Sequence, residues 1–130
     1  MKLKPFPSEL LPEGFKYPQE FLDFLKDTSS LDNQADGQEW WIIHENAEFA
    51  ESCLKRRLDK AKEYPIKKLI PFAKDDDTMA FACFDGDDHS GQPKIIFDTY
   101  YDVLEEVDWD QRFKVTFKEW LNNALTGNWD

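Results

Sequence analysis

The residues best suited to chemistry are two groups of aspartates on either side of a short apolar run. The first group is residues 75–77, and the second is residues 85–88, which His89 follows. Clustered carboxylates are the usual ligands of hard cations. The alternation of Asp85, Asp87 and His89 suits ligands on one extended segment, so a divalent-metal hydrolase is one hypothesis. The six aspartates are Asp75, Asp76, Asp77, Asp85, Asp87 and Asp88.

The established acidic metal-binding patterns do not match these groups. In an EF-hand loop starting at Asp85, Ser90 would occupy the position that requires glycine, and a loop starting at Asp75 would use Met79 as a ligand. The segment "HENAE" begins like the helix of zinc proteases, but Glu48 stands where the second histidine should be. We therefore favour solvated turns between strands and predict no metal site.

Nucleophilic catalysis and phosphate binding have equally little support. Cys53 and Cys83 each lie inside an apolar pattern, where a cysteine behaves as a small hydrophobic residue. The chain has only His44 and His89 as possible bases, and no local signature joins either one to a cysteine. The five glycines form no phosphate-binding loop. We expect no catalytic residues, no cofactor and no disulfide framework.

The negative charge is concentrated in the second part of the chain. The net charge is -11, with 12 basic and 13 acidic residues in 1–74 but 4 basic and 14 acidic residues in 75–130. Such a field repels nucleic acids and anionic membranes and attracts a basic partner. The alternative is that acidity only keeps a small protein soluble. No apolar run is long enough to span a membrane, and the start of the chain lacks a signal-peptide pattern, so we expect a cytoplasmic protein.

Hydrophobic spacing predicts alternating helices and strands in one α+β domain, residues 1–130. The period is helical after Pro18, and again after the N-cap residue Asn46 until Pro65. Short β-type runs follow, with turn residues between them; Pro71 indicates a bulge or a sheet edge. The expected elements are a helix from 18, a strand over 40–44, a helix over 47–64, strands within 67–73, 78–84 and 94–101, and a final helix.

The final helix has the clearest local signal. Thr116 and Glu119 form a capping-box pattern, and Gly127 is suited to end the helix. We expect Trp129, beside the C-terminus, to lie in a frayed tail. The fold class is α+β, with helices flanking a mainly antiparallel sheet, a meander of about four or more strands.

Two adjacent tryptophans, Trp40 and Trp41, open the first expected strand. Neighbouring side chains of a strand face opposite sides of the sheet, so one tryptophan is expected in the core. The other, for which we choose Trp41, is a candidate interface anchor, since exposed aromatic residues often serve that purpose. The alternative is that helices cover both.

Several segments of the chain resemble those of a known family. The segments "LLPEGFKYPQEFLDFL", "WWII", "LIPFAKDDDTMAFACFD" and "FKEWLNNAL" are similar to those of the SUKH superfamily, the Smi/Knr-type domains named for yeast cell-wall regulators. The resemblance covers roughly Leu10 to Leu125. The family usually has glycine with aspartate in the turn that follows Ile70–Ala73, where this chain has only Asp75, Asp76 and Asp77.

The resemblance implies an α+β domain without enzymatic activity. Many bacterial members are thought to be immunity proteins that neutralise toxins, often nucleases. The hypothesis that follows is a module that binds a basic toxin domain through the six aspartates and Trp41. The alternative is a regulatory or scaffold domain like the yeast relatives, with an endogenous partner. The oligomeric state is left open.

Overall fold

The computed structural model describes residues 2–63, 67–98 and 115–129. Its four strands are β1 (Trp40–Ile42), β2 (Leu69–Asp75), β3 (Phe81–Asp85) and β4 (Ile95–Asp98). They form one antiparallel sheet in the order β1-β2-β3-β4, with each strand hydrogen-bonded to the next along the chain. The α+β class and the antiparallel meander predicted from the sequence are thereby confirmed.

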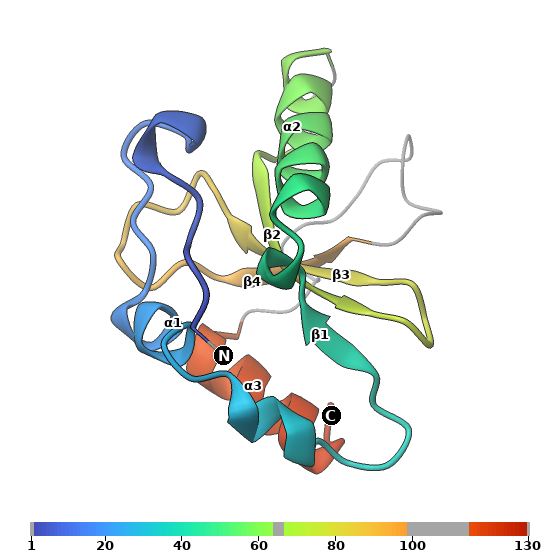
Figure 1. Cartoon of the computed structure of the whole chain (residues 1–130). Coiled ribbons are helices and arrows are strands. Elements are labelled where there is room, and N and C mark those ends of the chain that lie inside the picture. Colours follow the sequence, from blue (N-terminus) through green and yellow to red (C-terminus); the bar gives the residue numbers. More distant parts are fainter. Residues whose placement is uncertain (1, 64–66, 99–114, 130) are drawn as a thin grey trace.

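Helices cover both faces of this sheet (Figure 1). The helices α1 (Gln19–Phe24) and α3 (Phe117–Thr126) contact each other and lie on one face, whereas α2 (Ala47–Glu63) packs against β2 from the other. Short 3₁₀ turns also occur among the described residues. These turns are η1 (Ser8–Leu10), η2 (Ser29–Asn33) and η3 (Ile43–Glu45). No helix in the described ranges is both long and apolar enough to cross a bilayer.

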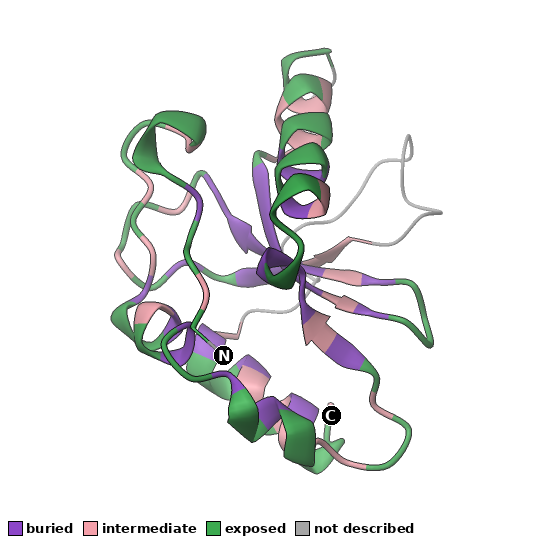
Figure 2. Ribbon diagram, viewed as in Figure 1, coloured by how far each residue is buried: buried purple, intermediate pink, exposed green. Residues whose placement is uncertain are grey.

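The main core is an aromatic cluster between the sheet and the α1/α3 face. Phe72 stacks on Phe84 with ring centroids 4.5 Å apart, and Trp120 meets Phe72 edge-on at 4.9 Å. Phe21 of α1 contacts the same two phenylalanines. Figure 2 shows this burial along the strands and on the inward sides of the helices. Edge-to-face contacts of this kind add to the stabilisation that apolar burial provides.

A bulge in β2 gives the core an extra aromatic ring. The pairing of β2 with β3 shifts register between Pro71 and Ala73, which leaves Phe72 without a partner on β3. Such an insertion places two neighbouring side chains on one face. Phe72 and Ala73 consequently both join the core, and each is fully buried. The bulge also fits the prediction made from Pro71, which cannot donate a ladder hydrogen bond.

The predicted helix signals are found where the sequence placed them. The Asn46 side chain accepts a hydrogen bond from the Phe49 amide at 3.1 Å. Thr116 and Glu119 form both bonds of the capping box, and Gly127 ends α3 in the left-handed conformation at φ 75°. Some limits differ slightly: Pro18 precedes α1 as its N-cap, and β1 ends at Ile42 because the chain turns into η3.

Three predictions cannot be compared with the structure at all their positions. Two of them concern the end of the helix expected over 47–64: its last residue and the stop at Pro65 lie outside the described ranges. The third is the last expected strand, of which residues 99–101 lie outside them.

The expectation of a frayed tail at Trp129 was wrong. Its indole ring lies 5.9 Å from Trp40 and 5.6 Å from Phe97, centroid to centroid. Its Nε1 donates a hydrogen bond to Gln38 Oε1 at 2.9 Å. The terminal segment is held because an indole can bury its apolar ring and still satisfy its single donor.

Candidate functional site

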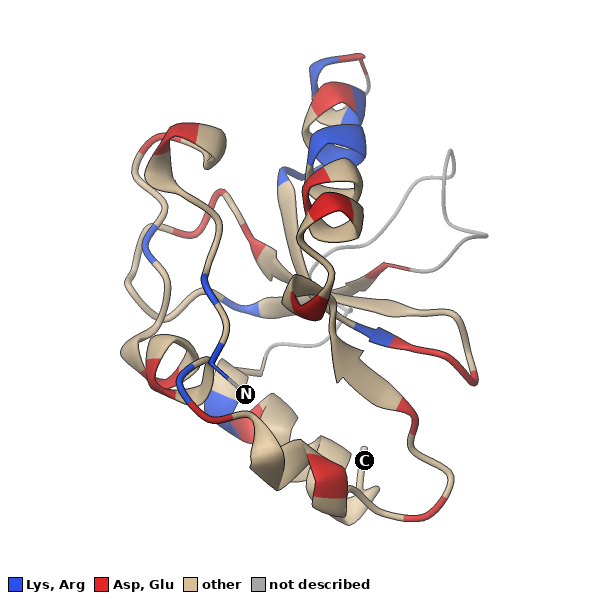
Figure 3. Cartoon of the chain, in the orientation of Figure 1, with Lys and Arg blue, Asp and Glu red and all other residues tan. Residues whose placement is uncertain are grey.

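The two acidic groups lie at opposite ends of β3. Asp75 closes β2 just before the turn into β3, whereas Asp85 closes β3 itself. A five-residue strand separates its ends by roughly 13 Å, at about 3.3 Å per residue. Figure 3 shows acidic residues at both of these turns rather than on one continuous patch. The six aspartates predicted to bind a partner therefore belong to two separate surfaces.

Asp75 and Asp85 have equivalent positions in these two turns and are both buried, each 6% exposed. The Asp75 carboxylate accepts hydrogen bonds from the Asp77 amide at 3.1 Å and from the Thr78 hydroxyl at 3.0 Å. The Asp85 carboxylate accepts one from the Asp87 amide at 2.9 Å and pairs with Lys67 Nζ, also at 2.9 Å. Both carboxylates shape their turns, as aspartate often does by bonding the backbone two residues ahead.

The remaining carboxylates of the second group are also bonded within the turn. Asp87 is exposed and accepts from the Lys68 amide at 3.3 Å. Asp88 accepts from the amides of Ser90 at 3.0 Å and Lys94 at 3.2 Å. Burial alone would raise the pKa of Asp88, but these hydrogen bonds and the Lys94 charge lower it on balance. This turn is a local structure built around its carboxylates.

The first group is the more exposed of the two, and Asp76 forms an ion pair with Lys74. We define the acidic hairpin tip as residues 76–79, all of which are exposed. Trp41 Nε1 donates to Asp76 Oδ1 at 3.0 Å, and Lys74 Nζ bonds the same oxygen at 3.1 Å. These two bonds lower the pKa of Asp76, so it stays ionised. The Asp77 carboxylate has no partner among the described residues.

The structure brings Trp41 and Asp76 together, two of the residues predicted to bind a partner. Trp41 is half-buried because α2 covers one side of its ring, which stacks on Phe49 with centroids 5.7 Å apart. Trp40 on the opposite face is only 6% exposed. Trp41 is thus the more exposed of the two tryptophans, with α2 covering one side of its ring. The Asp76 amide bonds the carbonyl of exposed Glu39 at 3.2 Å, which adds another acid beside the tip.

Met79 is a feature of the tip that the sequence did not reveal. It is 53% exposed and has a left-handed backbone, with φ 64°. This conformation is unfavourable for most side chains, and glycine usually supplies it in turns. The sequence offers no signal for it, because residues 75–80 contain no glycine and the commonest turns need no positive φ.

The residues considered for metal chemistry do not converge. The ring of His89 lies beside Gly14 in the N-terminal segment, where an added Cβ would be only 2.9 Å from His89 Cε1. One Asp85 oxygen is already paired with Lys67. Across the described ranges, no group of three or more His, Cys, Asp or Glu side chains is placed to hold a metal ion.

The possible nucleophiles are buried and unreactive. Burial raises the pKa of Cys83 to about 12 and also raises that of Cys53, so neither forms a thiolate readily at neutral pH. Burial lowers the pKa of His44 to about 4, which keeps its ring neutral.

Comparison with known proteins supports the family resemblance seen in the sequence. A family model described as the SMI1 / KNR4 family (SUKH-1) matches residues 2–123. Neither a search of curated proteins nor a search of solved structures returned a significant match. The matched range includes both acidic turns and all the described helices and strands except the last residues of α3. The chain is therefore a member of the SMI1/KNR4 family (SUKH-1).

Proposed function

We propose that this chain is a non-catalytic interaction module, an immunity protein that binds and neutralises a cognate toxin in the cytoplasm. Its membership of the SUKH family is compatible with a protein-binding role. The observation that carries the proposal is the acidic hairpin tip, where exposed Asp76 accepts a hydrogen bond from half-buried Trp41 and exposed Asp77 follows it in the turn. An aromatic ring with neighbouring carboxylates provides apolar contact area together with attraction for cations.

A basic toxin domain is the partner that this chemistry fits best. A nuclease needs positive charge to hold its substrate, because the phosphate backbone dominates nucleic-acid affinity. An acidic surface with net charge -11 behind it would attract such a domain over a distance and raise the association rate. The same field opposes direct contact of this chain with nucleic acids or anionic membranes.

The separation of the two acidic turns allows a sharp test. The variant Asp76→Asn/Asp77→Asn removes charge from the tip, and Asp87→Asn/Asp88→Asn removes the same charge from the opposite end of β3. Binding to a candidate basic toxin domain, sought first among the neighbouring genes, would be measured by surface plasmon resonance from low to moderate salt. We expect the first variant to lower the association rate about tenfold and flatten its salt dependence, while the second stays close to wild type.

The outcomes distinguish the mechanism from the wider function. Equal effects of the two variants would mean that a diffuse acidic field, and not the tip in particular, attracts the partner. Unchanged binding in both would remove the acidic mechanism. If the candidate toxin does not bind and is not neutralised on co-expression, the immunity function fails. The regulatory scaffold is then favoured if a tagged chain repeatedly recovers one housekeeping protein at moderate salt.

A further inference from the structure

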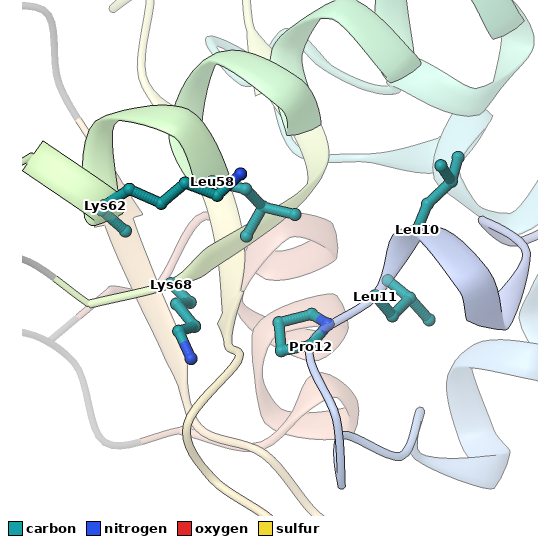
Figure 4. Close-up of a pocket in the computed structure, with 7 residues that line it drawn as sticks. Leu10, Leu11, Pro12, Leu58, Lys62 and Lys68 are labelled. Atoms are coloured by element: carbon teal, nitrogen blue, oxygen red, sulfur yellow. The ribbon is translucent and has the colours of Figure 1, made fainter.

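A shallow apolar groove lies between the N-terminal segment and the second half of α2. Its volume is about 190 Å³. In Figure 4, side chains of the N-terminal segment form one side, and side chains of α2 and of Lys68, which precedes β2, form the other. The residues that line it are Leu10, Leu11, Pro12, Leu58, Ala61, Lys62 and Lys68.

The α2 side of this groove extends beyond the core. The buried residues of α2 are Ala50, Cys53 and Leu54, all in its first half. Leu58 and Ala61, one and two turns further on, are only partly covered, as the exposed end of α2 in Figure 2 illustrates. Across the groove, Leu10 is 39% exposed. Apolar side chains thus remain accessible on both sides of the groove.

The polar side chains known to line the groove, among the residues that the structure describes, are those of two lysines. They are Lys62 and Lys68. The Lys62 side chain is 79% exposed, and its contact with Asp59 is a loose surface pair at 3.7 Å. The Lys68 side chain is exposed and forms no ion pair within the described ranges. Lysines near the end of a helix also favour its dipole, which accounts for Lys62 but not for Lys68 on the segment before β2.

We propose that this groove docks an acidic peptide segment of a partner protein. One or two aliphatic side chains of the segment enter between Leu58 and the N-terminal leucines, and neighbouring carboxylates pair with Lys62 and Lys68. The volume is below the roughly 300 Å³ at which pockets for drug-sized molecules begin, which favours side-chain anchors. The surface lies at a different place from the acidic hairpin tip and has the opposite charge, so the proposal goes beyond toxin binding.

A peptide fits this surface better than a membrane does. A bilayer is contacted by protruding apolar residues with a broad basic face. Here the apolar residues line a concave groove instead, which suits side chains of a peptide better than a flat bilayer surface. Two lysines at the edge of a groove provide local charge complementarity for a pair of carboxylates.

The test uses the full chain and a short fluorescein-labelled peptide in which leucine alternates with glutamate. Binding would be followed by fluorescence anisotropy. Lys62→Glu/Lys68→Glu should weaken it at least about tenfold, or about 1.4 kcal/mol. Lys55→Glu/Arg56→Glu makes the same charge change on exposed residues of α2 outside the groove and should have little effect. Thermal unfolding would verify that both variants are folded.

Two further measurements keep the proposal falsifiable. Ala61→Trp fills the groove without changing its charge and should also abolish peptide binding. A peptide with lysine in place of glutamate should not bind. Equal losses in the two charge variants, or unchanged binding when Ala61 is replaced, would overturn the proposal. So would preferential binding to phosphatidylserine vesicles that depends on Lys62 and Lys68.

Discussion

Arg57 of α2 and Asp98 of β4 form an ion pair across one face of the sheet, with Nε 2.9 Å from Oδ2. The side chains are only 13% and 27% exposed. The guanidinium also lies 4.3 Å from the ring centroid of Phe81, which faces Asp98 in the neighbouring strand. The basic side of α2 therefore contributes to packing at this position, where one charged group joins the helix to two strands.

Removing the Arg57 side chain should cost substantial stability. Arg57→Ala leaves Asp98 partly buried without its partner and removes the cation from the Phe81 ring, so we expect a loss of about 2 to 3 kcal/mol in the free energy of unfolding. Urea denaturation would measure it. In the matched variant Arg57→Met/Asp98→Asn no charge is left unpaired, and much of the loss should be recovered. A double variant as unstable as Arg57→Ala would show that the ion pair is not the cause.

His44 should make the protein less stable in mild acid. Its ring contacts Phe6 and Phe21, and burial lowers its pKa from 6.5 to about 4 in the folded state. Below about pH 6.5 the unfolded chain therefore takes up a proton that the folded chain does not. Stability present at neutral pH is lost as the pH falls towards 4, by up to about 3 kcal/mol.

Replacing His44 by phenylalanine isolates this contribution. Phenylalanine keeps the aromatic contacts but cannot be protonated, so His44→Phe should flatten the stability profile between about pH 6.5 and pH 4. Urea midpoints measured across this range would provide the comparison. The carboxylates that are stabilised in the folded state, such as Asp76, titrate below their ordinary pKa of 3.8 and should affect both proteins alike. Parallel profiles for the two proteins would rule out His44 as the origin.

The features predicted correctly from the sequence depend on residues close together in the chain. The Thr116–Glu119 capping box, the Gly127 stop and the Asn46 cap each involve neighbours within a few positions. The partners of these hydrogen bonds are fixed by local spacing, so they can be read from the sequence without knowledge of distant contacts. The antiparallel meander could likewise be read from the short turns between the apolar runs.

The missed features depend on residues far apart in the sequence. The Arg57–Asp98 pair and the contact of Trp129 with Gln38 form only after the sheet and helices have assembled. The separation of the two acidic groups is different, because it already followed from the predicted topology. Successive turns of a meander lie at opposite ends of the strand they share. The prediction that the six aspartates form one surface used only their closeness in the sequence. It did not take into account that successive turns alternate between the two ends of the sheet.

The strain at Met79 predicts a stabilising substitution. Its positive φ of 64° is unfavourable for a side chain, and its exposure indicates that little packing is lost on truncation. We expect Met79→Gly to raise the free energy of unfolding by about 0.5 to 1 kcal/mol. This is the relief of backbone strain minus the cost of the larger conformational entropy that glycine loses on folding. Chemical denaturation would measure the change. Met79→Ala is the control, since it removes the same side chain and keeps the strain. If alanine stabilises as much as glycine, backbone strain is not responsible.

Gly86 should tolerate no side chain, for a reason unrelated to backbone conformation. A Cβ there would approach the Lys68 carbonyl oxygen to 2.3 Å, and this oxygen already accepts a hydrogen bond from the Gly86 amide at 2.7 Å. Both groups belong to the backbone, so relief requires the second acidic turn to move away from the start of β2. We expect Gly86→Ala to cost about 2 to 3 kcal/mol, in the range found for overpacked sites.

Gly91 provides the matched comparison for this prediction. It has a φ of +87°, but a Cβ there would meet no atom within 4 Å. Gly91→Ala therefore tests the cost of a left-handed alanine alone, which should be about 1 kcal/mol. Thermal and urea unfolding of both variants would separate the two effects. A cost at Gly86 no greater than that at Gly91 would mean that the turn yields easily. The close approach of Gly86 to Lys68 would then not hold the acidic turn in place.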